Sequence, residues 1–215
     1  MVDHLELREG LRTTPSRRYL ADTPIPDDVL WDLLDTAVCG PSGGNRQGWG
    51  WVVVTDPDAK ARIARWYSDG WEKAYGVRRD ELLDPAREGA ELGLSPSSYR
   101  ATEHLAGHIA EAPVFVVPVL RNAADSTDKR LGASIYGAVQ QLLLAARGYG
   151  IGGVLTLFHL TGESDVDELL GLPDDAATMG LVPLGYPARG RWSTPRRQPV
   201  EEVVHWGRWG EQHSR

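Results

Sequence analysis

Short apolar runs that alternate with stretches of helical apolar spacing are the feature that most restricts how this sequence can fold. The runs lie at residues 49–55, 114–120, 151–158 and 179–184, and they are typical of buried strands. Apolar residues recur at helical spacing over 27–38, 57–67 and 126–147, and shorter helices are expected before Arg12 and at 165–170. Strands that alternate with helices predict an α/β or α+β fold.

Residues 1–215 are expected to form a single domain, because 215 residues suffice for one sizeable core and the chain has no internal repeat or linker. Residues 70–105 are mainly polar and of mixed composition, with glycine, proline and serine near their end. We expect this segment to form an excursion or lid beside a substrate pocket, rather than part of the core.

Charge and composition exclude several functional classes. The net charge of −7 and the pI of about 5.4 argue against a nucleic-acid binder, which needs an excess of Lys and Arg. Cys39 is the only cysteine, which excludes an internal disulfide or a cysteine zinc cluster. His104 and His108 are four residues apart, but no further ligands accompany them, so no metal site is expected. No run is long enough to cross a membrane, and the first ten residues are no signal peptide, so a cytoplasmic protein is expected.

Two short strings match known motifs but stand in the wrong context. The segment 148–153 contains G-x-G-x-x-G, yet it follows a helix and precedes a strand, whereas a dinucleotide site needs the opposite order. The segment 40–44 contains G-x-S-x-G around Ser42, but the sequence before it is helical, whereas a hydrolase needs a strand there. A glycine helix stop explains the first string, and a hydrolase at Ser42 remains a weak alternative for the second.

Three polar clusters have no evident role in folding: residues 12–18, 41–47 and 189–197. Arginines near both chain ends would suit one phosphate, because guanidinium groups match phosphate oxygens. Solvated surface arginines explain the same pattern equally well. In the middle cluster, glycines let the backbone approach a flat ligand, and Ser42, Asn45 and Gln47 offer hydrogen bonds to a heteroaromatic edge. A plain polar turn is the alternative.

Five motifs in a consistent order resemble the nitroreductase-like flavoprotein family. The segment Pro41-Ser42-Gly43-Gly44-Asn45-Arg46-Gln47-x-Trp49 is similar to that family's P-S-x-x-N-x-Q-P-W, with Gly48 in place of the proline. The other four are Arg17-Arg18-Tyr19 with Pro24-Ile25-Pro26, Gly148-Tyr149-Gly150-Ile151-Gly152, Leu184-Gly185-Tyr186-Pro187, and the tail from Arg197 to Val204. The resemblance covers nearly the whole chain and leaves only residues 70–105 unassigned.

The resemblance implies an α+β fold in which helices flank a mixed, mainly antiparallel central sheet. It also implies an intertwined homodimer with two FMN sites, each built from both subunits. By analogy Arg12 and Arg197, with Arg196 beside the latter, hold the FMN phosphate. Arg17 faces the pyrimidine side of the flavin and stabilises negative charge there on reduction. Arg12 departs from the pattern, since it precedes Arg17 by five residues rather than four.

The same resemblance assigns roles to two further segments. Pro41, Ser42 and Gly43 pack on the flavin ring from the partner subunit, with Asn45 and Gln47 close by. The backbone at Leu155 and Thr156 reaches flavin N5. Pro15 departs from the pattern, since it stands where a hydroxyl or a basic side chain would help to hold the phosphate.

The expected reaction is ping-pong hydride transfer from NADH or NADPH to an electron-poor acceptor of the nitroaromatic or quinone type. The flavin carries the chemistry, so no catalytic side chain is expected. Four aromatic residues are candidates for stacking on an aromatic substrate, with ordinary packing as the alternative: Tyr67, Trp71, Tyr75 and Tyr99.

Two other functions stay open within the same resemblance. One is a flavin-dependent oxidase or dehydrogenase of a biosynthetic substrate. The other is a flavin-binding protein without turnover. The sequence selects neither NADH nor NADPH, and it does not identify the natural substrate.

Overall fold

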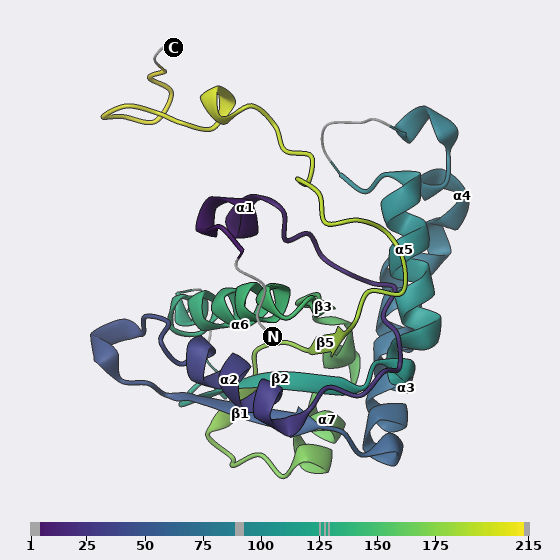
Figure 1. Cartoon of the computed structure of the whole chain (residues 1–215), viewed down its shortest axis with the longest axis vertical. Coiled ribbons are helices and arrows are strands. Elements are labelled where there is room, and N and C mark those ends of the chain that lie inside the picture. The colour runs from purple at the N-terminus through teal and green to yellow at the C-terminus, as the bar shows by residue number, and fades with distance from the viewer. Residues whose placement is uncertain (1–4, 89–92, 125, 127, 129, 213–215) are drawn as a thin grey trace.

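An antiparallel sheet forms the centre of the computed structural model, which describes residues 5–88, 93–124, 126, 128 and 130–212 (Figure 1). The strands follow the order β1–β2–β5–β3, and β4 also pairs with β2. Their bounds are β1 Trp49–Val54, β2 Val114–Arg121, β3 Gly152–Gly153, β4 Ala176–Thr178 and β5 Val182–Gly185. All pairings among the described strands are antiparallel, so the α+β class is confirmed, but the expected mixed sheet is not seen in this part of the chain.

Strand β2 is the centre of the core because it is buried on both faces. Successive side chains of a strand point to opposite faces. Phe115 and Val117 accordingly join one apolar cluster, and Val114 and Val116 join the other. A strand buried on both faces reads as a continuous apolar run, which is why this strand is evident in the sequence.

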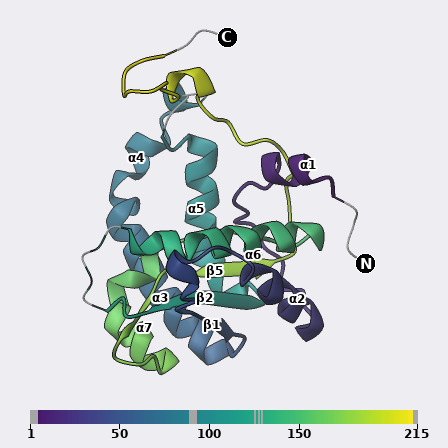
Figure 2. The ribbon, with the colours of Figure 1, turned by 90° about the vertical axis from the view of Figure 1, so that its left-hand side faces the viewer.

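Helices α2 (Asp27–Ala37) and α6 (Tyr136–Gly148) cover one face of the sheet, and α1 (Leu7–Arg12) lies outside α6 (Figure 2). The two acidic residues Asp27 and Asp28 favour the start of α2, since they lie at the positive end of the helix dipole. Gly40 follows α2 where the chain touches α6. A Cβ at Gly40 would lie 2.7 Å from the Cα of Ala138, so glycine permits this close approach.

Helices α3 (Pro57–Ala74) and α5 (Pro96–His108) stand on the other face with α4 (Arg79–Leu82), while α7 (Glu163–Leu170) packs lower on the same side. Asp56 caps α3 by accepting a hydrogen bond from the Ala59 N–H at 2.8 Å, and Pro57 occupies the first turn. Ser95 and Pro96 begin α5 in the same way. Short 3₁₀ turns connect these helices, at Gly76–Arg78, Pro85–Arg87 and Ile109–Glu111.

Three of the expected elements are wrong in extent. The helix expected from residue 126 begins only at Tyr136, after a 3₁₀ turn at Leu131–Ser134, because Asp128 accepts a hydrogen bond from the Arg130 N–H and holds a turn. The strand expected over 151–158 is reduced to Gly152–Gly153, with a 3₁₀ turn at Phe158–Gly162. The strand expected over 179–184 begins at Val182, and β4 was not expected.

The end of the chain leaves the sheet and does not pack on it. Residues 186–197, here named the C-terminal strap, leave β5 and pass between α1 and α5 (Figures 1 and 2). Beyond the strap, a 3₁₀ turn at Val200–Glu202 lies far from the sheet, and Trp209 is 90% exposed. Among the described residues, no helix is long and apolar enough to cross a membrane.

Candidate functional site

A cavity of about 730 Å³ lies where the two ends of the chain meet. The segment that follows α1 contributes Thr14, Ser16 and Arg18 to its wall, and the strap contributes Trp192, Arg196 and Arg197. Gly152 and Gly153 of β3, together with Gln140 of α6, line it from the side of the sheet. The polar clusters at residues 12–18 and 189–197 therefore converge on one site.

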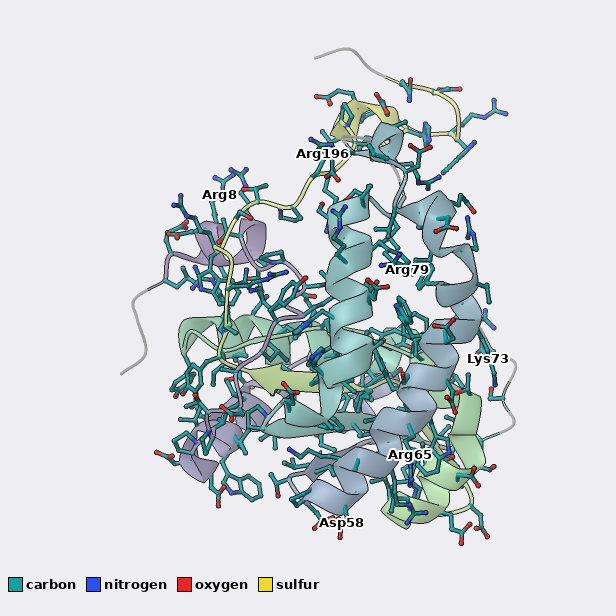
Figure 3. The ribbon with its side chains drawn as sticks, turned by 90° about the vertical axis from the view of Figure 1, so that its right-hand side faces the viewer. Arg8, Asp58, Arg65, Lys73, Arg79 and Arg196 are labelled. Atoms are coloured by element: carbon teal, nitrogen blue, oxygen red, sulfur yellow. The ribbon has the colours of Figure 1, made fainter. Side chains whose placement is uncertain are left out.

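The wall of this first cavity is predominantly cationic. It carries the arginines Arg18, Arg196 and Arg197 against one carboxylate, Glu88, which is exposed and accepts a hydrogen bond from the Ser97 hydroxyl. Figure 3 shows Arg196 on the strap. Guanidinium groups suit phosphate, and so does the Ser16 hydroxyl, which makes no hydrogen bond within the described part of the chain.

A second cavity, of about 340 Å³, has an aromatic wall. Tyr67 of α3, Tyr75 and Phe158 line it, and the Phe158 ring meets the two tyrosine rings edge-on, with centroids 5.5 and 5.6 Å apart. Such edge contacts stabilise aromatic boxes. Arg18 lines both cavities and so lies between the cationic one and the aromatic one.

Arg18 is a half-buried cation without a protein counter-charge. Within the part of the chain that the structure describes, it makes no hydrogen bond or ion pair. Burial lowers the pKa of Arg18, and the nearby Tyr67 and Tyr75 oppose this effect. A buried charge is costly unless it is paired, so the position favours a ligand that brings negative charge or a polarised carbonyl group.

Arg17, the residue expected at the flavin, lines neither cavity. Its guanidinium donates hydrogen bonds to the carbonyls of Arg189 and Arg191 in the strap, at 2.5 and 2.8 Å. The side chain of Arg17 is directed to the strap, and its neighbour Arg18 is the one that faces the cavities. The Arg-Arg pair was visible in the sequence, but the sequence could not show which member faces the cavities.

The backbone at Leu155 and Thr156, which was expected at flavin N5, borders the aromatic cavity. Thr156 exchanges two backbone hydrogen bonds with Leu181, both 2.9 Å long. The Leu155 N–H, in contrast, has no acceptor within the described part of the chain. Of these two amides, Leu155 therefore has the donor that a ligand can use.

The loop at residues 41–47 lies outside both cavities. Pro41, Gly43, Asn45 and Gln47 are exposed and Ser42 is half-buried. The loop is nevertheless held by two hydrogen bonds, one within it and one to Ser134. The Gln47 N–H donates to Ser42 Oγ at 3.0 Å, and the Gly43 N–H donates to Ser134 Oγ at 3.2 Å. Among the described residues, no histidine hydrogen-bonds to Ser42, and the strand β1 follows the serine, which is the reverse of the hydrolase arrangement.

Three other expected contacts are not brought to the cavities. Arg12 is exposed at the end of α1. Trp71 is 5% exposed and Tyr99 is fully buried, and both pack in the core cluster on the α3 and α5 face. Tyr67 and Tyr75 do line the aromatic cavity. Trp192, Thr14 and Ser16 were missed, because an isolated tryptophan and hydroxyls carry no sequence signal of their own.

Comparisons with known proteins identify the family of the chain. The family model described as the nitroreductase family matches residues 11–186. The chain is similar to an NADH dehydrogenase of Thermus thermophilus, with 31% identity over 92% of this chain and 93% of that protein. It is similar to a 4-nitrobenzoate reductase of Nocardioides, with 29% identity over 90% of this chain and 87% of the other. A crystal structure of iodotyrosine deiodinase bound to FMN and 3-iodo-L-tyrosine shares the fold, with a TM-score of 0.72 and 23% identity over 95% of this chain and 100% of that one.

Proposed function

The chain belongs to the nitroreductase family, and on that premise we propose that it is an FMN-dependent oxidoreductase that uses NADH or NADPH to reduce a small electron-poor aromatic molecule. The observation that carries the proposal is the position of Arg18, an unpaired, half-buried cation between a cationic cavity and an aromatic one. FMN is a flat ring joined to a phosphate, and the two cavities offer one environment for each end.

The residues present fit FMN by their chemistry. Arg196, Arg197 and the Ser16 hydroxyl line the cationic cavity and would hold the phosphate. A volume of about 730 Å³ lies within the usual range for cofactor sites, which is about 300–1,000 Å³. Arg18 and the free Leu155 N–H would contact the polar edges of the ring. When bound, FMN supplies the group that accepts and donates hydride.

The protein side of the reaction is electrostatic and steric. The Arg18 guanidinium would stabilise negative charge that develops beside it, and its partial burial makes this effect stronger than it is in bulk water. Tyr67, Tyr75 and Phe158 exclude water and offer ring faces to an aromatic substrate. These roles need no side-chain acid or base.

We propose a nitroaromatic or a quinone as the acceptor, and the similarity to a 4-nitrobenzoate reductase supports the nitroaromatic class. The fold shared with iodotyrosine deiodinase adds halogenated phenols to the compounds to be tested. NAD(P)H and the acceptor are proposed to use one site in turn, which predicts parallel double-reciprocal plots. Intersecting plots would contradict this order of binding.

A second copy of the chain is proposed to complete the site. The ordered but exposed loop at residues 41–47 lies outside both cavities, and the end of the chain exposes apolar side chains instead of burying them: Val200, Val203, Val204 and Trp209. Both features suit a homodimer in which the loop of one copy packs on the ring bound by the other. Light scattering on the purified protein measures this, and a monomer that binds FMN would contradict it.

The decisive experiment is to record the visible spectrum of the purified protein and to identify what heat releases. We expect FMN. The variant Arg18→Gln should lower the midpoint potential of bound FMN and slow its reduction by about a hundredfold, the usual cost of one well-placed charge donor. Arg65→Gln, on the exposed face of α3 (Figure 3), is the control. A protein that takes up no FMN would overturn the proposed function.

A further inference from the structure

The C-terminal strap is joined to the N-terminal segment first by its backbone. The Ala21 N–H donates to the Tyr186 carbonyl at 2.7 Å, and the Ala188 N–H donates to the Tyr19 carbonyl at 2.9 Å. Leu20 and Pro187 form the bridge between these bonds. Beyond Ala188 no backbone hydrogen bond joins the two segments in the described part of the chain, so side chains must hold the rest of the strap.

Arg17 provides that connection. The residue is only 9% exposed, and its two terminal nitrogens donate to strap carbonyls on either side of Gly190. Gly190 has a φ of +85°, so the strap turns there, and a Cβ on it would lie 3.3 Å from both terminal nitrogens. The strap therefore bends around the guanidinium at a residue that glycine suits best.

The aliphatic part of the Arg17 side chain is held as closely as its guanidinium group. A Cβ on Gly152 of β3 would lie 2.5 Å from Cγ of Arg17, so the stem lies flat on a strand that only glycine leaves open. The Arg17 N–H also donates to the Gly153 carbonyl at 2.9 Å. Arg17 is thus wedged between the sheet and the strap.

Trp192 extends the arrangement toward the cationic cavity. Two guanidinium groups approach its ring, with Arg17 Cζ 5.0 Å and Arg147 Cζ 4.1 Å from its centroid. Each contact is within the range of a cation–π interaction. Trp192 lines the cationic cavity, and the strap then supplies Arg196 and Arg197 to the same wall.

We propose that Arg17 is a positioning residue, which fixes the strap and thereby places Trp192, Arg196 and Arg197 at the phosphate end of the cavity without contacting the cofactor itself. The inference rests on the proposed function only for the identity of the ligand. It follows from the direction of the side chain, because its hydrogen bonds end on strap carbonyls and the residue lines neither cavity.

The test compares Arg17→Gln with Arg17→Lys and with the control Arg8→Gln, an exposed arginine of α1. Three quantities are measured: hydrogen exchange of residues 188–197 without FMN, the Kd for FMN, and the midpoint potential of bound FMN. Arg17→Gln should speed exchange in the strap and weaken FMN binding by about tenfold or more, because two charge-assisted hydrogen bonds are lost. The midpoint potential should stay at the wild-type value.

A double variant checks the route through the strap. If Arg17 acts through Trp192, then Arg17→Gln combined with Trp192→Ala should bind FMN no more weakly than the worse single variant. A shifted midpoint potential with unchanged strap exchange would overturn the proposal, since it would place Arg17 at the cofactor. If the wild-type protein bound no FMN, the exchange data alone would decide, and unchanged exchange would reject it. Should Arg17→Gln fail to fold, the same three quantities are measured on Arg17→Lys, which keeps the positive charge but loses the paired donor groups of the guanidinium.

Discussion

The imidazole ring of His104 stacks on the ring of Tyr19, with centroids 4.2 Å apart and planes inclined by 26°. His108 stacks on the other side of His104 at 4.1 Å, and Arg189 of the strap lies over the far face of Tyr19 at 3.4 Å. This column joins α5, the N-terminal segment and the strap, all three of which line the cationic cavity.

The column predicts that acid weakens the fold. Burial, His108 and Arg189 lower the pKa of His104, and Glu111 opposes them. The folded state therefore favours neutral His104, so its contribution to stability is complete above the unfolded pKa of about 6.5 and is lost as the pH falls through the folded pKa. NMR titration of the His104 ring should show this pKa below that of a free histidine.

Arg189→Gln supplies the matched test, because it removes one cation from the column and leaves the rings in place. The pKa of His104 should rise toward its ordinary value in that variant. A pKa that does not move would show that Arg189 has no electrostatic influence on the ring.

His159 predicts a second and larger acid effect. The residue is fully buried, neither ring nitrogen has a hydrogen-bond partner among the described residues, and burial lowers its pKa to about 4. Between pH 6.5 and 4, His159 binds a proton in the unfolded chain but stays neutral in the folded chain. The free energy of unfolding therefore falls by about 3 kcal/mol over that range. His159→Phe should remove this part of the pH dependence in denaturant unfolding at several pH values. Parallel pH profiles of the two proteins would contradict the assignment.

Two helix glycines should respond to alanine in opposite directions. A Cβ on Gly70 of α3 would lie 2.2 Å from the Phe158 carbonyl oxygen, so Gly70→Ala should destabilise the protein by about 1–3 kcal/mol through overpacking. A Cβ on Gly107 of α5 would meet nothing within 4 Å, so Gly107→Ala should stabilise by about 0.5–1 kcal/mol through helix propensity. Thermal unfolding measures both changes in stability. If both variants were stabilised or both destabilised, the packing argument would be refuted.

Variants of Arg196 and Arg197 should show whether these residues bind the phosphate of FMN or its ring. Arg196→Gln and Arg197→Gln should weaken FMN binding by about ten- to a hundredfold, as expected for lost charge-assisted hydrogen bonds. Riboflavin, which lacks the phosphate, should bind each variant as well as it binds the wild type. Isothermal titration with both ligands checks this, and equal losses for FMN and riboflavin would place these arginines away from the phosphate.

The extent to which the sequence predicts this fold depends on how local each signal is. Strand β2 and helix α2 were evident, since a continuous apolar run and helical spacing need only neighbouring residues. The strand expected at 151–158 was wrong, because its apolar residues serve a two-residue strand, the edge of a cavity and a 3₁₀ turn in succession. Trp71 and Tyr99 resembled substrate contacts, yet they are buried in the core, and burial depends on residues distant in sequence.

The sequence by itself determined the fold class and the family, because motifs and spacing are properties of the chain alone. It left the convergence of the two arginine-rich ends as one of two equal alternatives, and the tertiary structure decided for it by bringing both ends to one cavity. Only the tertiary structure decided between Arg17 and Arg18. Arg17 binds the strap whereas Arg18 lines the cavities, and which of the two faces a cavity depends on where β3 and the strap pack. The same limit applies to the loop at 41–47, whose exposure follows from the packing of α2 against α6 and not from its own residues.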